Sequence, residues 1–346
     1  MSSLLNDPTA RTWAEEAMQR HSEKHFGRIA SAVIWSNERG DDGELLVAAD
    51  PSVLVHRIND GGQILLHDHD PGKPLGRVIE AADFMNKDGT HFVAAILGFY
   101  VGGASLGFHE LGIDVMEDPP LPDNLPPLPT ASLWIEIAAD PREIDQAWLN
   151  EISEDSPLSV KRTELSHNTA AQTQELIRIG LVYLSVAWNP FTKALMTEAG
   201  KRTYNLIHEW LASVLTKMGE RQKPVLDIHS FQDDCQVSFL IRGNDVKLNH
   251  EAHSTLHKAA AQAAMLIGKL RERGIPADQL TYEFDRESLL WFPSFAILED
   301  GRMVSDRMKL IAIEQLPTGL SVGLTRGNFT APVARTIPDS SDEYRD

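Results

Sequence analysis

The stretch HEAHSTLHKAAAQAAMLIGKLRER, residues 250–273, decides how the chain is interpreted, because it is the clearest helix in the sequence. Apolar residues recur along it at helical spacing, and Gly274 and Pro276 end the pattern. The spacing predicts a single helix that packs on a sheet made from the strands on either side. The residues expected to face this sheet are Ala259, Ala260, Ala263, Ile267 and Leu270.

The segments on both sides of this helix have the composition of β-strands. Before it, two apolar segments enclose a short polar turn, which predicts a hairpin. After it, Asp300-Gly301 is a strong turn signal between a long strand and a short one. The last third of the chain therefore reads strand–strand–helix–strand–strand. The expected strands are residues 225–230, 236–242, 280–284, 291–298 and 303–304.

Residues 130–330 as a whole predict a mixed α/β domain. Asp140 can cap a helix that begins directly after it. Residues 169–188 fit either one long helix or a helix followed by a strand, because their second half is rich in β-branched residues. The other expected elements are helices over 141–152 and 197–218 and strands over 131–138 and 158–165.

A proline-rich segment separates this domain from the first part of the chain. The sequence PPLPDNLPPLP, residues 119–129, holds six prolines in eleven residues and suits an extended, semi-rigid connector. We therefore predict a linker over 117–129 and place the main domain boundary there. A docking motif for a proline-recognising partner is the alternative. At the other end, residues 331–346 are expected to be a loose acidic tail.

The first part of the chain is predicted to be a helix followed by a small β domain. Within residues 1–27, a helix is expected from Pro8, with Trp13 and Ala17 on one face. Residues 28–116 contain short apolar segments separated by turn residues, which favours a compact β unit. The fold class is therefore α+β. The expected strands of this unit are residues 29–35, 45–48, 53–58, 63–67 and 91–101.

Composition narrows the range of functions. The formal charge of −18 repels phosphate backbones, so nucleic acid is not an expected partner. The single cysteine, Cys235, allows neither an intramolecular disulfide nor a cysteine-rich zinc site. The longest apolar run, 177–188, is too short to cross a membrane and contains Arg178. With a polar N-terminus that lacks a signal peptide pattern, these features favour a cytoplasmic protein with no membrane partner.

Three local patterns could carry chemistry. His67 and His69 would share one face of a strand and could bind a metal, although Asp70-Pro71-Gly72 is turn chemistry. Ser105 stands between Gly103 and Gly107, as in a nucleophile elbow, but the helix expected after such a turn is missing. A third pattern, His250, His253 and His257, falls on one helix face and is expected to be solvated rather than metal-binding.

Residues 28–110 resemble the prohead, or capsid-maturation, proteases of tailed phages. The similar segments are LLHDHDP at 65–71, KPLGRV at 73–78, DG at 88–89 and ASLGF at 104–108, in the family's order and approximate spacing. The resemblance implies a small β-barrel that carries a serine protease site. It covers about a quarter of the chain and leaves the last 200 residues without a counterpart.

The resemblance also implies the roles of individual residues. Ser105 would be the nucleophile and His69 the general base, since a serine hydroxyl needs an adjacent imidazole near neutral pH. Backbone amides near Gly107 would form the oxyanion hole. The family's acidic third member has no match at its usual position. Glu136 is a shifted candidate for that role, and Asp114 is another.

Three functions are consistent with these patterns. The first is a serine endopeptidase that acts on a protein or peptide substrate with a Ser-His pair and no cofactor. An alternative is a non-catalytic assembly or ligand-sensing protein derived from a phage or mobile element. The third is a metal-dependent enzyme built on His67 and His69. The sequence leaves open whether activity is retained and whether the chain forms a homo-oligomer.

Overall fold

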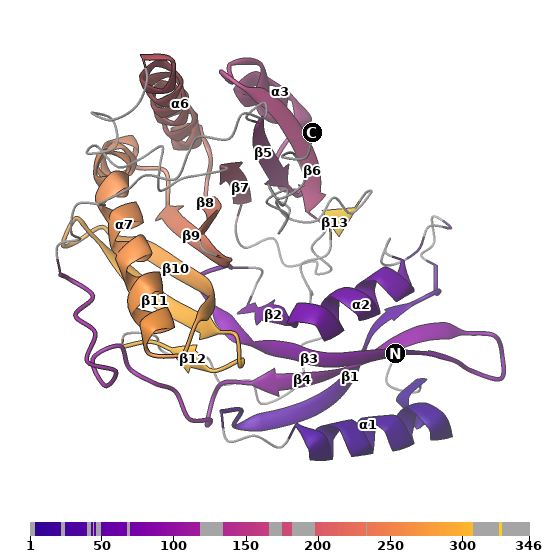
Figure 1. Cartoon of the computed structure of the whole chain (residues 1–346). Coiled ribbons are helices and arrows are strands. Elements are labelled where there is room, and N and C mark those ends of the chain that lie inside the picture. The colour runs from indigo at the N-terminus through magenta and orange to yellow at the C-terminus, as the bar shows by residue number, and fades with distance from the viewer. Residues whose placement is uncertain are drawn as a thin grey trace, which may run out of the picture.

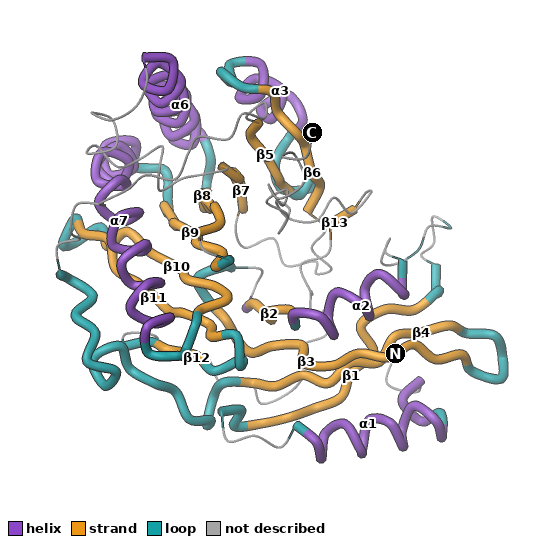
Figure 2. The backbone as a smooth tube through the Cα atoms, viewed as in Figure 1, coloured by secondary structure: helices purple, strands orange, loops and turns teal. Residues whose placement is uncertain are grey.

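The computed structural model describes residues 4–21, 25–39, 43, 45, 50–67, 70–117, 134–165, 175–181, 198–232, 234–306 and 325–326. These residues form a mixed α+β structure with two β-sheets, as Figures 1 and 2 show. The larger sheet has nine strands and the smaller sheet has four. Both the expected proline-rich linker after residue 117 and the expected acidic tail lie outside the described residues.

The four-stranded sheet is antiparallel and has the order β1-β4-β3-β2. Its central strand β4 is buried on both faces, because Phe92, Ala94 and Ile96 pack toward α1 while Val93 and Leu97 pack toward α2. The two helices therefore cover opposite faces of this sheet (Figure 1). The elements are α1 (Pro8–Arg20), β1 (Arg28–Ser36), α2 (Pro51–Gly61), β2 (Gln63–Leu66), β3 (Pro74–Met85) and β4 (His91–Phe99).

The β-barrel expected for residues 28–116 is not found. The described residues contain no closed barrel, and β1 and β2 are the two edges of an open sheet. The physical reason is the presence of α1 and α2, which bury the two faces of the sheet without the need for closure. The prediction for α1 itself is confirmed, since Trp13 and Ala17 pack on Ile96 of β4.

The predicted strand over residues 53–58 is also wrong, because this segment is the helix α2. The Asp50 carboxylate accepts hydrogen bonds from the Ser52 and Val53 amides, and Pro51 occupies the first turn. Leu54 and Ile58, four residues apart, then face the core. Capping and helical spacing thus outweigh the strand preference of the valines and isoleucine.

The nine-stranded sheet has the order β12-β11-β10-β9-β8-β7-β5-β6-β13 and mixes parallel and antiparallel pairs. The expected hairpin is confirmed as β8 and β9, and the Asp300-Gly301 turn joins β11 to β12. Its strands are β5 (Trp134–Ala139), β6 (Ser159–Leu165), β7 (Glu175–Leu181), β8 (Pro224–Gln232), β9 (Cys235–Arg242), β10 (Ala277–Asp285), β11 (Leu290–Leu298), β12 (Met303–Val304) and β13 (Thr325–Arg326).

Three helices cover one face of this sheet and enclose the main core. They are α3 (Gln146–Glu154), α6 (Glu198–Lys217) and α7 (Val246–Glu272). The long helix predicted from the sequence is α7, which contacts β9, β10 and β11. All five residues expected to face the sheet, Ala259, Ala260, Ala263, Ile267 and Leu270, are buried in this core. This part of the prediction is confirmed.

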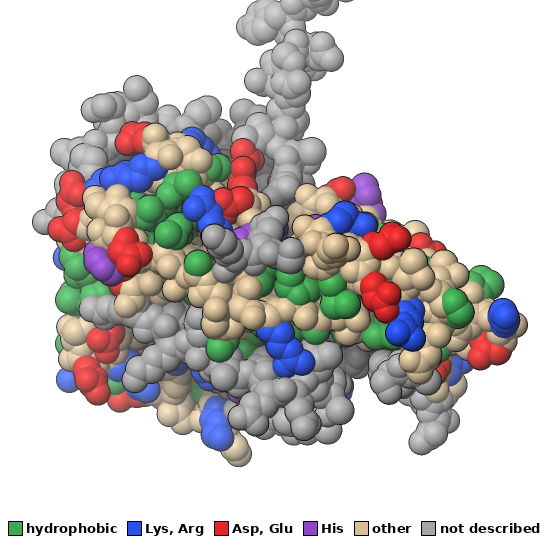
Figure 3. All heavy atoms as spheres, turned by 90° about the horizontal axis from the view of Figure 1, so that it is seen from below, with side chains coloured by type: hydrophobic (Ala, Val, Ile, Leu, Met, Phe, Trp, Pro, Cys, Tyr) green, Lys and Arg blue, Asp and Glu red, His purple; other side chains and the backbone are tan. Residues whose placement is uncertain are grey.

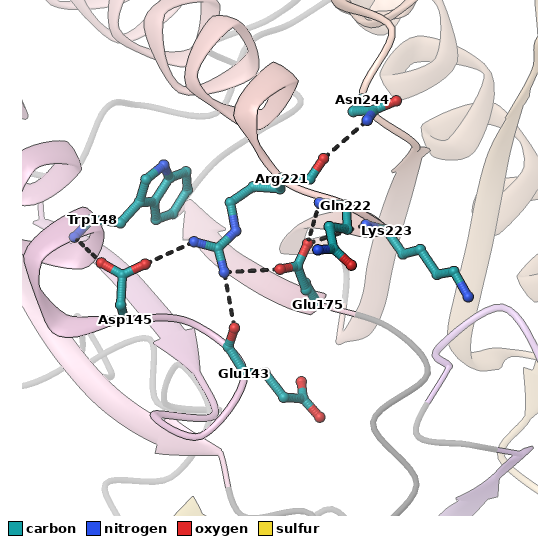
Figure 4. Close-up of polar contacts among 8 residues, drawn as sticks. All are labelled: Glu143, Asp145, Trp148, Glu175, Arg221, Gln222, Lys223 and Asn244. Carbon is teal, nitrogen blue, oxygen red and sulfur yellow. Dashed lines mark hydrogen bonds and ion pairs between the residues drawn. The ribbon is translucent and has the colours of Figure 1, made fainter.

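Arg221 holds the starts of β7 and β8 next to α3, as Figure 4 shows. Its guanidinium donates to Asp145 Oδ2 at 2.8 Å, and to Glu175 Oε1 and the Glu143 carbonyl at 2.9 Å each. The other oxygen of Glu175 accepts the backbone amides of Gln222 and Lys223. Because Glu175 begins β7 and Asp145 caps α3, one side chain fixes three elements.

The two sheets pack against each other. Tyr100, at the end of β4, lies in one apolar cluster with Phe295 and Met303 of the large sheet. Farther along the chain, Phe108 and Ile113 are buried in the main core. The structure therefore does not confirm a division of the chain at residue 116.

Within the described ranges, no helix is long and apolar enough to span a bilayer. On the face seen in Figure 3, acidic and basic side chains are interspersed with hydrophobic ones among the coloured residues.

Candidate functional site

A pocket of about 660 Å³ lies where the two sheets meet. The small sheet contributes the end of α2 and two residues of β3, while the large sheet contributes two of its turns and Asp278 of β10. The residues that line it are His21, His25, Phe26, Ile58, Asn59, Asp60, Gly61, Gly62, Arg77, Ile79, Asp234, Asp278, Glu299, Asp300 and Gly301. Its volume is in the range of small-molecule sites, and we call it the junction pocket.

Arg77 is the fixed cation of the junction pocket. Its guanidinium donates to the Gly61 carbonyl and lies 3.9 Å from Asp278 Oδ2 of β10. Gly62, with φ of 64°, packs so closely on the guanidinium that a Cβ there would collide with it. Arg77 therefore reaches from β3 across the pocket wall to the large sheet.

Carboxylates outnumber cations in the junction pocket. The lining contains five acidic side chains and one arginine, and its apolar floor is made of Phe26, Ile58 and Ile79. A concave, partly apolar wall lined with one sign of charge concentrates the electric field, so it attracts ions of the opposite sign. The acidic residues are Asp60, Asp234, Asp278, Glu299 and Asp300.

Ser105 is exposed and lies beside the edge strand β12. Its neighbour Leu106 pairs with Val304, and the Leu106 carbonyl accepts the Ser305 amide at 2.8 Å. The glycines on either side have packing roles. A side chain at Gly103 would collide with the His25 backbone, and one at Gly107 would crowd Asp306.

Two other residues proposed for the protease site, Gly107 and Glu136, make contacts that do not involve Ser105. The Gly107 amide donates to Glu110 Oε2 at 2.8 Å, so the proposed oxyanion donor already has an acceptor. Glu136 lies on β5, six strand positions from β12, which corresponds to roughly 30 Å. Its carboxylate accepts the Thr163 hydroxyl at 2.8 Å. Glu136 therefore cannot orient a base for Ser105, and His69 lies outside the described residues.

The alternative metal site on His67 and His69 gains no support. Among the described residues, no group of three or more histidine, cysteine, aspartate or glutamate side chains could hold a metal ion. His67 lies in a turn, where its amide donates to the Lys73 carbonyl at 2.9 Å. Asp114, the other acid considered, accepts the backbone amide of Met116 in its own loop at 2.9 Å.

Within the histidine–aspartate motif of residues 67–70, Asp70 makes the contacts that tie the motif to the large sheet. It is fully buried and forms a bidentate ion pair with Arg242 of β9, at 2.6 and 3.0 Å. Arg242 also donates to Glu283 of β10, and Lys73 lies 3.0 Å from Asp70. The histidine–aspartate motif therefore anchors the loop between β2 and β3 on the large sheet.

A histidine–aspartate pair that the sequence did not reveal lies near Ser105. His109 Nδ1 is 2.5 Å from Asp306 Oδ1, and the two residues are 197 positions apart in the chain. The hydrogen bond to Asp306, followed by its charge, raises the pKa of His109 above the usual histidine value. No local signal connects these residues, because their pairing depends on the contact of residues 104–107 with β12.

The three histidines of α7 are not simply solvated, as the sequence had suggested. His253 is 3% exposed and stacks on His208 of α6 with ring centroids 4.0 Å apart. His250 Nε2 lies 3.0 Å from the Thr216 hydroxyl of α6. Burial, followed by the neighbouring histidines, lowers the pKa of His253 to about 3. This helix face is therefore an interface between α6 and α7.

Comparison with known proteins finds no match: no protein-family model, no curated protein and no solved structure is similar to this chain. The relationship to prohead proteases therefore stays a proposal that rests on the sequence segments alone.

Proposed function

We propose that this protein is a non-catalytic ligand-sensing protein whose ligand occupies the junction pocket. The observation that carries the proposal is the origin of the pocket walls: both sheets contribute to one cavity of about 660 Å³. A ligand held there contacts both sheets at once and stabilises their packing. A ligand that binds only the folded state stabilises it by RT ln(1 + L/Kd), where L is the free ligand concentration, so stability rises with the logarithm of ligand concentration once the site is saturated.

The chemistry of the pocket walls favours an organic cation with an aliphatic body. Its carboxylates can pair with ammonium or guanidinium groups, while Phe26, Ile58 and Ile79 can pack on methylene groups. Arg77 is already paired with Gly61 and Asp278, and Arg302 pairs with Asp300 at 2.6 Å. The carboxylates that can meet a cation are therefore Asp234, Glu299 and Asp60, the last of which lies 3.0 Å from His56. Polyamines and arginine or lysine esters have this combination of groups.

Thermal unfolding with a small panel of compounds tests the proposal. Spermidine and arginine methyl ester are expected to raise the melting temperature, whereas succinate and a neutral diol are not. The double variant Asp60→Asn/Glu299→Gln should weaken binding of the cations about tenfold or more, because it removes two wall charges. Ile79→Trp, which fills the floor of the pocket, should have the same effect.

The matched control is Glu287→Gln, which removes one carboxylate from an exposed turn outside the pocket. This variant should bind the cations as the parent protein does. Equal loss of binding in the control, or no response to any compound in the panel, would show that the junction pocket is not the ligand site.

The contact of His109 with Asp306 favours a second candidate, a serine hydrolase centred on Ser105. Asp306 orients the imidazole through Nδ1 and leaves Nε2 directed to the other side, as in a triad. Ser105 lies four residues before His109 and is exposed. His69 stays the base that the resemblance implies, and His109 is the base that the structure adds.

Labelling with a fluorophosphonate probe tests this candidate. Ser105→Ala and His109→Gln should both abolish labelling if the serine is activated. The free energy of unfolding of Ser105→Ala should stay within about 0.5 kcal/mol of the parent protein, because the side chain is exposed. Ser254→Ala, an exposed serine of α7, is the control and should leave labelling unchanged. The absence of labelling in the parent protein would remove the hydrolase candidate.

A further inference from the structure

The face of the large sheet opposite its helices carries a row of mostly polar residues. Six neighbouring strands meet at one register level, where five of them place a polar residue and β7 places Gly180. In order from β6 to β10 these residues are Lys161, Glu136, Gly180, His229, Ser238 and Thr281. The adjacent residues of the same strands, which point to the helices, are the apolar residues of the main core.

The row is most deeply buried at β8, where two polar atoms have no hydrogen-bond partner among the described residues. Asp227 is fully buried, and its Oδ2 accepts Arg178 Nε at 2.8 Å while its Oδ1 accepts nothing. His229, two residues farther along the same face, is 3% exposed, and its Nδ1 has no partner. Burial of such atoms costs free energy unless another group pairs with them.

Gly180 allows the His229 ring to approach the neighbouring strand closely. It lies between Glu136 and His229, and a Cβ at this position would be 3.1 Å from the His229 ring and 3.2 Å from the Glu136 Cβ. The His229 ring therefore leans over the glycine toward β5. We call Glu136, Arg178, Gly180, Asp227 and His229 the β8 site.

The chemistry of the β8 site selects a hydrogen-bond donor with a positive charge. Burial, the largest effect, lowers the pKa of His229 to about 4, so the imidazole is neutral at physiological pH and can accept a hydrogen bond. Asp227 Oδ1 is a second acceptor. Arg178 pairs with Asp227 through Oδ2 only, and Lys161 stands opposite Glu136 on β6. Among the described residues, Asp227 Oδ1 is therefore the carboxylate oxygen of the site that lacks a donor.

We infer that the β8 site binds a protonated primary amine, whose ammonium group donates to Asp227 Oδ1 and His229 Nδ1. An ammonium group supplies three donors, which is sufficient for both acceptors, and its charge strengthens the hydrogen bond to the carboxylate oxygen. This site is separate from the junction pocket, because none of its residues lines that pocket. Its role therefore does not depend on the proposed function.

The full-length protein and methylammonium chloride as the probe are sufficient to test this inference. Methylammonium should shift the imidazole nitrogen resonances of His229 and raise the melting temperature. Tetramethylammonium, which has the charge but no N–H donor, should do neither. His229→Phe should weaken methylammonium binding about tenfold or more and, without the probe, melt at a higher temperature, because it removes an unpaired buried polar atom.

A second variant protects the test against misfolding. Gly180→Ala keeps Asp227 and His229 but fills the space between the ring and Glu136, so it should also lose the response. His56→Gln, an exposed histidine of α2, is the control and should respond as the parent protein does. Equal responses to methylammonium and tetramethylammonium would overturn the inference. So would a response that survives in His229→Phe and Gly180→Ala. It would also fail if the His229 resonances show a bound water and do not change when methylammonium is added.

Discussion

Replacement of Asp70 by asparagine is expected to destabilise the protein by about 3–5 kcal/mol, because it leaves the partly buried Arg242 guanidinium without its main counter-charge. Asp70 accepts two hydrogen bonds from Arg242 and one from the Gly72 amide at 3.0 Å. Burial alone would raise the pKa of Asp70, but Arg242, Lys73 and the Gly72 amide together hold it below its ordinary value. The charged form is therefore the one that the fold stabilises.

Urea unfolding of the parent protein and Asp70→Asn measures this effect. The control is Glu15→Gln, which breaks the exposed pair of Arg11 and Glu15 on α1 and should change the free energy of unfolding by less than about 0.5 kcal/mol. The double variant Asp70→Asn/Arg242→Met should recover part of the loss, since the partly buried guanidinium is then removed together with its main counter-charge, and Glu283 is the carboxylate that loses a partner. A loss in Asp70→Asn as small as that of the control would show that this ion pair does not hold the two sheets together.

Acidification from about pH 7.5 to about pH 5 is expected to cost about 2 kcal/mol of stability through His253 alone. Burial lowers the pKa of His253 to about 3 in the folded state, whereas an unfolded histidine has its ordinary value of about 6.5. Between these two values only the unfolded chain takes up the proton. Stability is therefore complete above about pH 7 and is lost as the pH falls through the unfolded value.

His229 should add to this loss in the same direction, because burial also lowers its pKa, to about 4. The groups that face His253 are His208 on α6 and His250 on α7, and both disfavour its protonation. An added charge would lie 4.0 Å from the stacked ring of His208, so the contact between α6 and α7 is the part expected to weaken first.

The measurement is the urea midpoint of the parent protein and of His253→Phe at both pH values. Phenylalanine keeps an aromatic ring on His208 but cannot be protonated, so this variant should lose about 2 kcal/mol less on acidification. His56→Gln, with its exposed side chain, should follow the parent curve. Parallel pH profiles for the parent protein and His253→Phe would contradict the prediction.

Local signals in the sequence were sufficient for much of the large sheet and for α7. The alanine-rich periodicity and the Gly274 stop identified the helix, and the Asp300-Gly301 turn identified the β11–β12 connection. At α2 they predict a strand, because its β-branched residues favour one, whereas the Asp50 cap starts a helix there. At β3 they give only the KPLGRV motif and no strand. Both failures concern segments whose conformation depends on the partner that they pack against.

The candidate sites could be predicted only in part, because distant residues build them. Asp70 and Arg242 are 172 positions apart, and His109 and Asp306 are 197 apart. Ser105 was predicted as a site residue, and Glu136 was assigned to the same site although it lies six strands away. The β8 site was not foreseen, since polar residues on single strands look unremarkable until the register of six strands aligns them.

The contacts of residues 100–113 with the last strands of the large sheet also affect how the chain can fold during its synthesis. Tyr100 donates a hydrogen bond to the Gly301 carbonyl, 201 residues later in the chain. At about 5–20 residues per second, a ribosome needs roughly 10–40 s to make the intervening segment. Throughout that time, Phe108 and Ile113 emerge without the strands that bury them in the finished protein. A nascent chain stalled before β11 should therefore offer these side chains to chaperones and proteases, and release from the ribosome should end that exposure.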